Sequence, residues 1–394
     1  MNIRRLTIAL WFILLVFILI LVLVPQENIY GANGIAKWVA SNGSWAVWVD
    51  RLGLTHFAAT WPFKLGVGVF ALVALYSLLQ QFALAYQQWC RGGIGGRWQP
   101  VKLKQKPADN WWQKAGLKQV NQGWLRHPVS LFAIPLFHLA LILIIIGGAV
   151  TYLLRVQATV SLTEGQAFTG QQQLEEIKKG PWADIKFPAE YLGLDKFDAN
   201  ATEPAAYVVR LTSKGEVLAR EKIAVNENLQ WHGYTLYLAR SGYAPGLEVK
   251  EGSKVLLAGY VAIKEESGQG EIKLPGEQAL SLAYDQKNQQ LLVNGLPLNQ
   301  GETRTLPQGL TVAFIDLRYW ASFLLVKDPG LYWIVAGSSA GIIALFFWLF
   351  RPPLEIVLNE EKGNWILKAR RKQWQSGIVA ELRQVMQKGE VLGE

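Results

Sequence analysis

One apolar run, Pro128–Leu154, constrains the fold of this chain more than any other stretch. It is longer than the roughly 20 apolar residues that cross a bilayer as a helix, so it predicts a membrane span. The run holds a single ionisable side chain, His138. An imidazole is costly to bury in lipid and usually faces a protein interior, a cavity or a ligand. His138 is therefore a candidate functional residue, and the alternative is a structural histidine that hydrogen-bonds a neighbouring helix.

Three further runs have the length and apolar character of membrane spans, and they account for a hydrophobic content of 51%. The four predicted spans are residues 6–24, 65–86, 129–154 and 331–350. The first run follows two arginines, as a signal peptide would. It is longer than a usual signal core and the sequence VPQEN after it offers no cleavage site, so we interpret it as a retained anchor.

The distribution of charge predicts the topology. Eight basic residues and one acidic residue lie in 91–126, whereas 156–330 has 17 basic and 21 acidic residues. Excess lysine and arginine in short loops marks the cytoplasmic side of a membrane. We therefore expect both termini and the 91–127 loop to be cytoplasmic and 156–330 to be outside. The net charge of +9 then points to anionic membrane lipid as a partner, and not to nucleic acid.

The long segment between the third and fourth spans has the two-residue alternation of β-strands. Examples are AAYVVRL, YTLYLAR and LTVAFIDL, separated by turn signals such as SKGE and PQG. The fold class that follows is four transmembrane helices plus a large extracytoplasmic all-β domain, a sandwich or an open barrel, between the third and fourth helices. The expected divisions are 1–90 (two spans and an outer loop), 91–127 (basic loop), 128–155 (third span), 156–330 (β domain), 331–350 (fourth span) and 351–394 (tail).

The remaining histidines and the one cysteine give weaker signals. His56 lies in the outer loop and could ligate a metal, or it could be an interfacial polar residue. His127 precedes His138 by 11 residues, which in a regular helix places both on nearly one face, about 16 Å apart, unless Pro135 kinks the helix. His232 is the only histidine of the β domain, which has no cluster of metal ligands. A lone Cys90 excludes an internal disulfide and any CxxC motif.

Three local patterns predict details of the membrane-flanking segments. The glycine run at 92–96 follows a membrane helix and not a strand, which favours a flexible linker over a nucleotide-binding loop. Trp111 and Trp112 belong to short amphipathic pieces that we expect on the membrane surface. Gly337 and Gly341 lie four residues apart, so this helix face should pack closely on another span. The sequence LEIVLNEEKGNWILKA after the last span predicts a hairpin.

Three strings and the order of the segments carry a family resemblance. The third span has the pattern FHLALILIIIGG around His138, and DPG leads into the fourth span. The β domain has the spacing I-x-V-N-x-x-L-x-x-x-G-x-x-x-Y, at Ile223, Val225, Asn226, Leu229, Gly233 and Tyr237. These strings, in the order of three spans, outer β domain, span and tail, resemble the ResB (CcsB-like) family of system II cytochrome c biogenesis, which has a signature of this spacing.

This resemblance implies that haem b is carried across the membrane and presented to an apocytochrome c. It also implies that His138 is an axial ligand of the haem iron, a role suited to a neutral imidazole. His127 and His56 are weaker haem-ligand candidates, and no site is transferred to His56 from the family. The tryptophan-rich haem loop of this system belongs to a ResC/CcsA-type partner, and this chain lacks a convincing one.

The sequence therefore predicts a membrane subunit of a haem-attachment complex, with no catalytic residue of its own. At most it is a non-autonomous part of a cytochrome c haem lyase. We expect it in the bacterial plasma membrane, although a thylakoid membrane fits the same pattern. The alternative is a scaffold that binds no haem and docks the apocytochrome or the ResC/CcsA-type partner.

Overall fold

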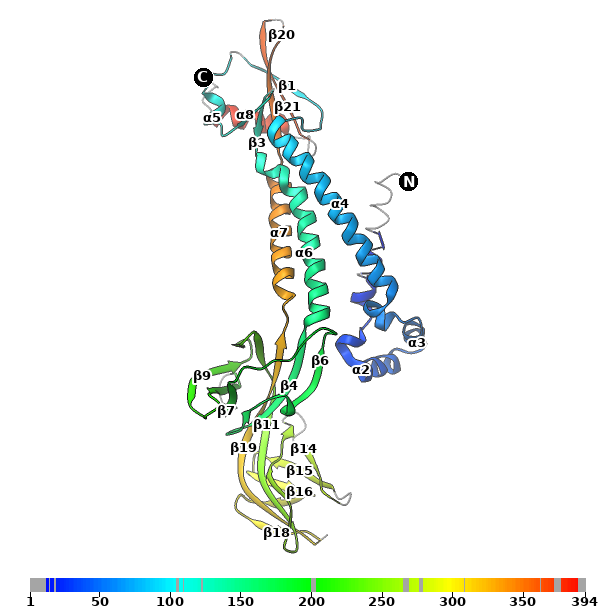
Figure 1. The fold of residues 1–394 in the computed structure, drawn as a ribbon, viewed down its shortest axis with the longest axis vertical. Helices are drawn as coiled ribbons and strands as arrows, with labels where there is room; N and C mark the ends of the chain where they lie inside the picture. Colours follow the sequence, from blue (N-terminus) through cyan, green and yellow to red (C-terminus); the bar gives the residue numbers. More distant parts are fainter. Residues whose placement is uncertain are drawn as a thin grey trace. The chain divides into compact units, whose positions relative to one another are not determined.

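In the computed structural model the chain forms two compact units (Figure 1). The first unit comprises Met1–Gly148 and Leu331–Glu394, and the second comprises Ala149–Gly330. The structure describes residues 12–13, 15–17, 19–103, 106–108, 110–121, 123–199, 203–264, 269–275, 279–307, 309–361, 363–371 and 377–388.

The described residues contain three helices that are long and apolar enough to cross a membrane. They are α4 (Trp61–Arg91), α6 (Ala133–Leu154) with the 3-10 turn η2 (Pro128–Phe132) before it, and α7 (Leu331–Phe350). The first predicted span, residues 6–24, lies partly outside the described residues. Its described part between 12 and 23 is helical. The structure thus supports three of the four predicted spans and leaves the first as a prediction.

Helices α6 and α7 approach each other at the small residues of α7, as the glycine spacing predicts. A Cβ atom added at Gly337 would lie 2.8 Å from the carbonyl oxygen of Ala140 and 2.9 Å from the Cγ1 atom of Ile144. At Gly341 the nearest atom, the Cβ atom of Ala140, would be 3.5 Å away, an ordinary contact. Gly337 is therefore the residue that lets the two backbones come together.

The segment before α4 folds into short helices. They are α2 (Glu27–Asn42), α3 (Ser44–Arg51) and the 3-10 helix η1 (Leu54–Ala59). The buried amide of Gln26 donates a hydrogen bond to the carbonyl oxygen of Leu54 and ties the start of this segment to its end (2.9 Å). Trp45, Trp48 and Trp61 remain exposed, as is usual for aromatic residues at a membrane interface.

The basic loop and the tail form one small domain, which local sequence patterns did not predict. Its five-stranded antiparallel sheet has the order β1-β21-β20-β3-β2, and Figure 1 labels four of these strands, β1, β3, β20 and β21, in one region. The strands are β1 (Gln99–Leu103), β2 (Lys118–Val120), β3 (Gly123–Arg126), β20 (Leu354–Glu361) and β21 (Asn364–Arg370). The domain also contains the helices α5 (Trp111–Lys114) and α8 (Ile378–Lys388).

This small domain has its own hydrophobic core. Trp111 and Trp112 lie in it and are buried, so the expectation that they lie on the membrane surface is wrong. The ring of Trp112 stacks on that of Trp124 with the centroids 3.5 Å apart. The predicted hairpin is confirmed, because β20 and β21 pair and turn between Glu361 and Asn364. Burial of two large aromatic rings explains why these tryptophans prefer the sheet to the lipid surface.

The glycine run at 92–96 is held in place and is not a flexible linker. The carboxylate of Glu355, on β20, accepts hydrogen bonds from the backbone N–H groups of Gly93 (3.0 Å) and Ile94 (2.8 Å). Glu355 is 5% exposed and also accepts a hydrogen bond from the guanidinium of Arg370 (3.0 Å). A Cβ atom at Gly96 would lie 2.1 Å from the carbonyl oxygen of Arg371, so glycine is required there.

The second unit is an antiparallel β domain, and its strands follow α6 and precede α7 in the sequence. Its largest sheet has eight strands in the order β10-β11-β19-β4-β6, with β12 and β13 paired to β11 and β18 paired to β19. These strands are β4 (Val156–Thr163), β6 (Leu174–Lys179), β10 (Leu229–Trp231), β11 (Tyr234–Glu251), β12 (Lys254–Tyr260), β13 (Ile263–Lys264), β18 (Thr303–Thr305) and β19 (Leu310–Lys327).

Two four-stranded sheets pack on this large sheet and create two separate cores. One has the order β5-β7-β8-β9 and the other β14-β15-β16-β17. Their strands are β5 (Ala167–Phe168), β7 (Tyr191–Asp198), β8 (Ala205–Leu211), β9 (Val217–Ala224), β14 (Gln269–Lys273), β15 (Ala279–Asp285), β16 (Gln290–Val293) and β17 (Leu296–Leu298), and the 3-10 turn η3 (Gln171–Gln173) precedes β6.

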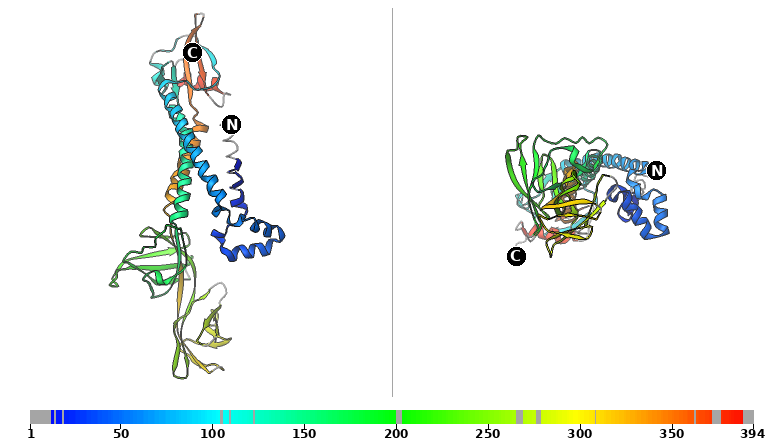
Figure 2. Two further views of the ribbon diagram at one scale, coloured as in Figure 1. Left: turned by 45° about the vertical axis from the view of Figure 1, so that its right-hand side comes forward. Right: turned by 90° about the horizontal axis from the view of Figure 1, so that it is seen from below.

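The strands β11 and β19 contribute residues to both cores, and Figure 2 shows them as long strands of the second unit. They pair from Thr235 and Val326 at one end to Glu251 and Leu310 at the other, with two register shifts that bend the ribbon. On β19, Phe323 is buried in one core and Phe314 in the other. Each core is thus enclosed by two facing sheets, as in a sandwich, and one pair of strands is common to both.

Candidate functional site

His138 lies in α6 and both of its ring nitrogens have hydrogen-bond partners. Its Nδ1 atom is 2.9 Å from the carbonyl oxygen of Ile134, one turn earlier in the same helix. Its Nε2 atom is 2.9 Å from the hydroxyl of Ser77, which belongs to α4. The side chain is half-buried between the two helices, and does not simply face lipid.

These two partners define the tautomer of the ring. A carbonyl oxygen can only accept a hydrogen bond, so Nδ1 must carry a proton and donate it to Ile134. In the neutral imidazole, Nε2 then holds a lone pair and accepts the Ser77 hydroxyl proton. The same arrangement, with one nitrogen donating to a backbone carbonyl, orients metal-ligating histidines. The arrangement therefore presents Nε2 as the nitrogen able to bind a metal ion once Ser77 releases it.

Ser77 is the site residue that sequence reasoning missed. It is a single hydroxyl within the apolar run of α4, in the sequence LYSLL, and serines of this kind are common in membrane helices. Its significance depends on the pairing of α4 with α6, which a single sequence does not reveal. The only local signal was that a polar side chain inside a span tends to bond to another helix.

His127 does not share a helical face with His138, so that expectation is wrong. His127 has a left-handed backbone conformation with a φ of 53°, and lies between β3 and the 3-10 turn η2. Helix α6 begins only at Ala133. Pro128 is the first residue of the 3-10 turn η2, a position that suits proline because its missing N–H needs no partner there, so His127 lies outside the helix.

The other two histidines are each paired with a glutamate. His56 lies in η1 and its Nδ1 atom contacts the carboxylate of Glu27, at the start of α2. In the second unit, the Nε2 atom of His232 is 3.1 Å from the carboxylate of Glu190. The interaction with His232, and after it the nearby charge of Arg210, lower the pKa of Glu190. Among the described residues, no group of three or more histidine, cysteine or acidic side chains forms a metal site.

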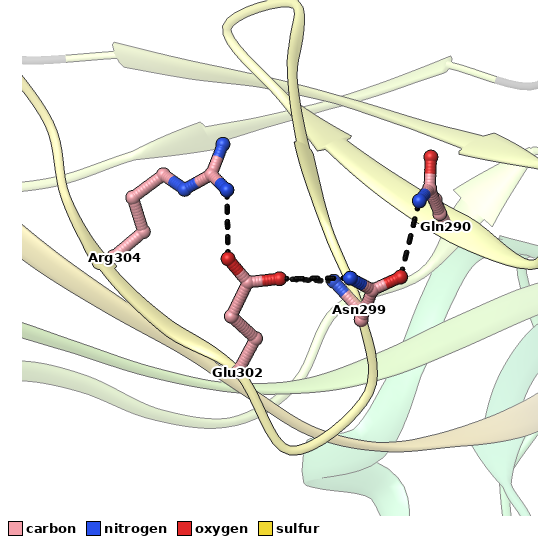
Figure 3. Close-up of polar contacts among 4 residues, drawn as sticks. All are labelled: Gln290, Asn299, Glu302 and Arg304. Atoms are coloured by element: carbon pink, nitrogen blue, oxygen red, sulfur yellow. Dashed lines mark hydrogen bonds and ion pairs between the residues drawn. The ribbon is translucent and has the colours of Figure 1, made fainter.

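A polar network in the β domain has a structural role (Figure 3). Glu302 accepts hydrogen bonds from the backbone N–H of Asn299 (2.9 Å) and from the guanidinium of Arg304 (2.7 Å). The side-chain oxygen of Asn299 accepts one from Gln290 (3.1 Å). The backbone N–H of Asn299, and then Arg304, lower the pKa of the Glu302 carboxyl. Because its groups satisfy one another, the network fixes the turn before β18 and offers no poised acid or base.

The fold and this site define a membrane protein. The described residues contain three candidate spans and a large antiparallel β domain. A model of the ResB-like family matches residues 129–289, which include His138 and the β domain as far as the turn after β15. The chain therefore carries a ResB-like region, as its sequence motifs indicated, and this implies a role in cytochrome c biogenesis. No curated protein matches the chain.

Proposed function

We propose that this chain is a membrane subunit of a system II cytochrome c haem-attachment complex, and that it holds haem through His138. The observation that carries the proposal is the hydrogen bond from Nδ1 of His138 to the carbonyl oxygen of Ile134 (2.9 Å). That bond leaves the lone pair on Nε2, the form in which an imidazole binds haem iron. The ResB-like match over this helix supports the same reading.

Haem is the substrate that is moved, and the protein supplies the nitrogen that holds it. Ser77 must give up its 2.9 Å hydrogen bond to Nε2 before iron can take that position. A hydrogen bond is worth about 0.5–1.5 kcal/mol net, whereas a buried polar group left without a partner costs about 1–3 kcal/mol. Ser77 therefore serves as a resting partner that keeps the Nε2 atom satisfied while no iron is bound.

Haem attachment itself would use groups from other proteins. The described residues offer no metal cluster and no activated thiol beside His138. The nucleophiles in this proposal are the thiols of the apocytochrome c, and a ResC/CcsA-type membrane partner supplies the outer haem-presenting loop. In this proposal the protein lies in the bacterial plasma membrane, and the charge bias of the loops supports an orientation with both termini in the cytoplasm.

The test is the absorption spectrum of the detergent-purified chain, expressed with and without its partner. The wild type should copurify with haem and show a Soret band, and His138→Ala should lose it. His138→Gly with added imidazole should regain the band, because free imidazole can occupy the same position. His232→Ala removes a histidine in the other unit and should leave the haem content unchanged.

A scaffold function is the second candidate, and the Ser77 hydrogen bond favours it. A histidine whose two nitrogens are both bonded within its own chain can serve simply to join α4 to α6. In that case the β domain would dock the apocytochrome or the partner, and haem would be bound elsewhere. Equal haem content in the wild type and in His138→Ala would support the scaffold and overturn the haem-holding proposal.

A further inference from the structure

The segment that follows β6 lies directly on the last turn of α6. The backbone N–H of Trp182 donates a hydrogen bond to the carbonyl oxygen of Leu153 (3.0 Å), and that of Gly180 donates to the carbonyl oxygen of Arg155 (2.8 Å). The last carbonyl groups of a helix have no partner within the helix, so this segment satisfies carbonyl groups at the end of a span. All four residues belong to the second unit.

Gly180 makes this close approach possible. A Cβ atom at this position would lie 2.3 Å from the carbonyl oxygen of Leu153 and 2.6 Å from that of Tyr152. Both atoms belong to the backbone of the helix and cannot rotate away, so a larger residue would push the segment off α6. The backbone of Trp182, two residues later, is therefore fixed against the end of the span.

The side chain of Trp182 is left open to the surroundings. It is 72% exposed, and with the described residues its ring makes no hydrogen bond, aromatic stacking or cation–π contact. Trp231 of the same domain is, in contrast, completely buried. An indole combines a large apolar surface with one N–H donor, so it suits a layer that is apolar on one side and wet on the other.

The length of α6 indicates the depth at which Trp182 lies. The helix has 22 residues, and at 1.5 Å for each residue it is about 33 Å long, close to the roughly 30 Å of a hydrocarbon core. A helix of this length that crosses the core ends where the headgroup layer begins. Arg155 and Lys179 are exposed at the same helix end, where basic side chains can reach lipid phosphates.

We propose that the β domain contacts the membrane surface through Trp182, whose ring enters the headgroup layer beside the end of α6. The occupant of this surface is the lipid of the leaflet on the side of the β domain, because the hydrogen bond to Leu153 ties the segment to the span itself. The domain is then attached to the bilayer at a second point, in addition to the chain that continues from α6 into β4.

The experiment is fluorescence quenching with the full chain in lipid nanodiscs, in which nitroxide groups are carried either on the lipid headgroups or near the middle of the acyl chains. Cys90→Ser removes the one cysteine of the chain. Trp182→Cys then takes an environment-sensitive fluorophore at an exposed position. Headgroup nitroxides should quench this label about threefold more strongly than mid-chain nitroxides, because aromatic residues of this kind lie at headgroup level.

The matched control is Val255→Cys in the same cysteine-free background. Val255 is also an exposed apolar residue, on β12, and its partner on β11 pairs with Thr311 of β19. The residue that follows α6 and Arg155, Val156, pairs with Lys327 of the same strand. At about 3.3 Å for each residue, these two points lie about 50 Å apart along β19. Neither kind of nitroxide should quench the label at position 255.

A second labelled variant keeps Trp182 in place. Asp184→Cys carries the fluorophore at an exposed position two residues away, and headgroup nitroxides should quench it as well. Adding Trp182→Gln should lower this quenching about twofold, whereas Trp182→Phe keeps an apolar ring and should preserve most of it.

Equal quenching at positions 182 and 255 would overturn the proposal, as would unchanged quenching at position 184 in Trp182→Gln. Protection of the label that appears only when another protein copurifies would also overturn it, because the surface would then bind a protein and not lipid. His138→Ala should leave every quenching ratio unchanged, so this result is independent of haem binding.

Discussion

Gly337 of α7 lies against Ala140 of α6, and a Cβ atom on Gly337 would be 2.8 Å from the carbonyl oxygen of Ala140. Ala140 is two residues after His138 in the same helix and is 2% exposed. The helix that carries His138 is thus held by α7 near Ala140 and by Ser77 of α4 at its ring. The imidazole is therefore positioned by contacts with two neighbouring helices, α7 and α4.

Gly337→Ala should therefore destabilise the helix pair. The new methyl group would meet backbone atoms of α6, which cannot rotate away, so the helices must separate. Overpacking of this kind costs about 1–3 kcal/mol. The measurement is the unfolding midpoint in detergent, followed by circular dichroism. Gly341→Ala is the control in the same helix and should behave like the wild type, because its nearest neighbour would be 3.5 Å away.

Ser77→Ala should strengthen haem retention by the purified chain about two- to tenfold, if the proposed function is correct. The hydroxyl competes with iron for Nε2 of His138, and its removal abolishes that competition. The hydrogen bond that is lost has a net free energy of about 0.5–1.5 kcal/mol, which corresponds to this change in affinity. Haem titration with Soret absorbance measures the change. Tyr76→Phe removes the neighbouring hydroxyl, which bonds to Gln80, and should have no effect. Complete loss of haem in Ser77→Ala would show that Ser77 supports binding.

Glu355→Gln should loosen the glycine run at 92–96. The buried carboxylate accepts from two backbone N–H groups and from Arg370, and hydrogen bonds to charged groups are worth about 1.5–3 kcal/mol each. The expected result is faster cleavage by trypsin after the exposed Arg97, because proteolysis follows local opening.

The control for this substitution is Glu361→Gln on the same strand. Glu361 pairs with Lys368 at the surface, and exposed ion pairs contribute about 0–1 kcal/mol. Its cleavage rate should match that of the wild type. Equal acceleration in both variants would contradict the assignment of Glu355 as the residue that holds the run.

Glu302→Gln should destabilise the β domain near neutral pH and lose its effect in acid. The backbone N–H of Asn299 and the guanidinium of Arg304 lower the pKa of Glu302 below its ordinary value of 4.5. A lowered pKa in the folded state gives stability that is present above the ordinary pKa and disappears as the pH falls through the lowered one. The thermal unfolding midpoints of the wild type and the variant should therefore differ at pH 7, and the difference should disappear in acid below pH 4.5. The exposed Glu271→Gln should show no difference at either pH.

The membrane helices and the β domain could be predicted because their signals are local. Apolar runs located the three described spans, and alternation located the strands of 156–330. The close approach at Gly337 was also visible in the spacing of small residues. The identity of His138 as the candidate residue needed only its position within an apolar run.

Other features depend on contacts between distant segments, which leave no local pattern. Strand β1 pairs with β21, and the partner residues Gln99 and Ala369 lie in opposite halves of the sequence. When that pairing is not known, the segment around Trp111 and Trp112 looks like an amphipathic surface segment, although both side chains lie in the core of the small domain. Ser77 was missed for the same reason, because only the packing of α4 on α6 brings its hydroxyl to His138.

The sheet that joins the loop to the tail also determines the order in which this protein can mature. Strand β3 ends at Arg126, and its neighbour β20 begins only at Leu354, more than two hundred residues later. At about 5–20 residues per second, a ribosome needs at least about 10 s to make the chain in between. During that interval the edge of β3 that will pair with β20 stays open, and the tryptophans lack the tail residues that complete their core. The loop must therefore wait for the last part of the chain to be made.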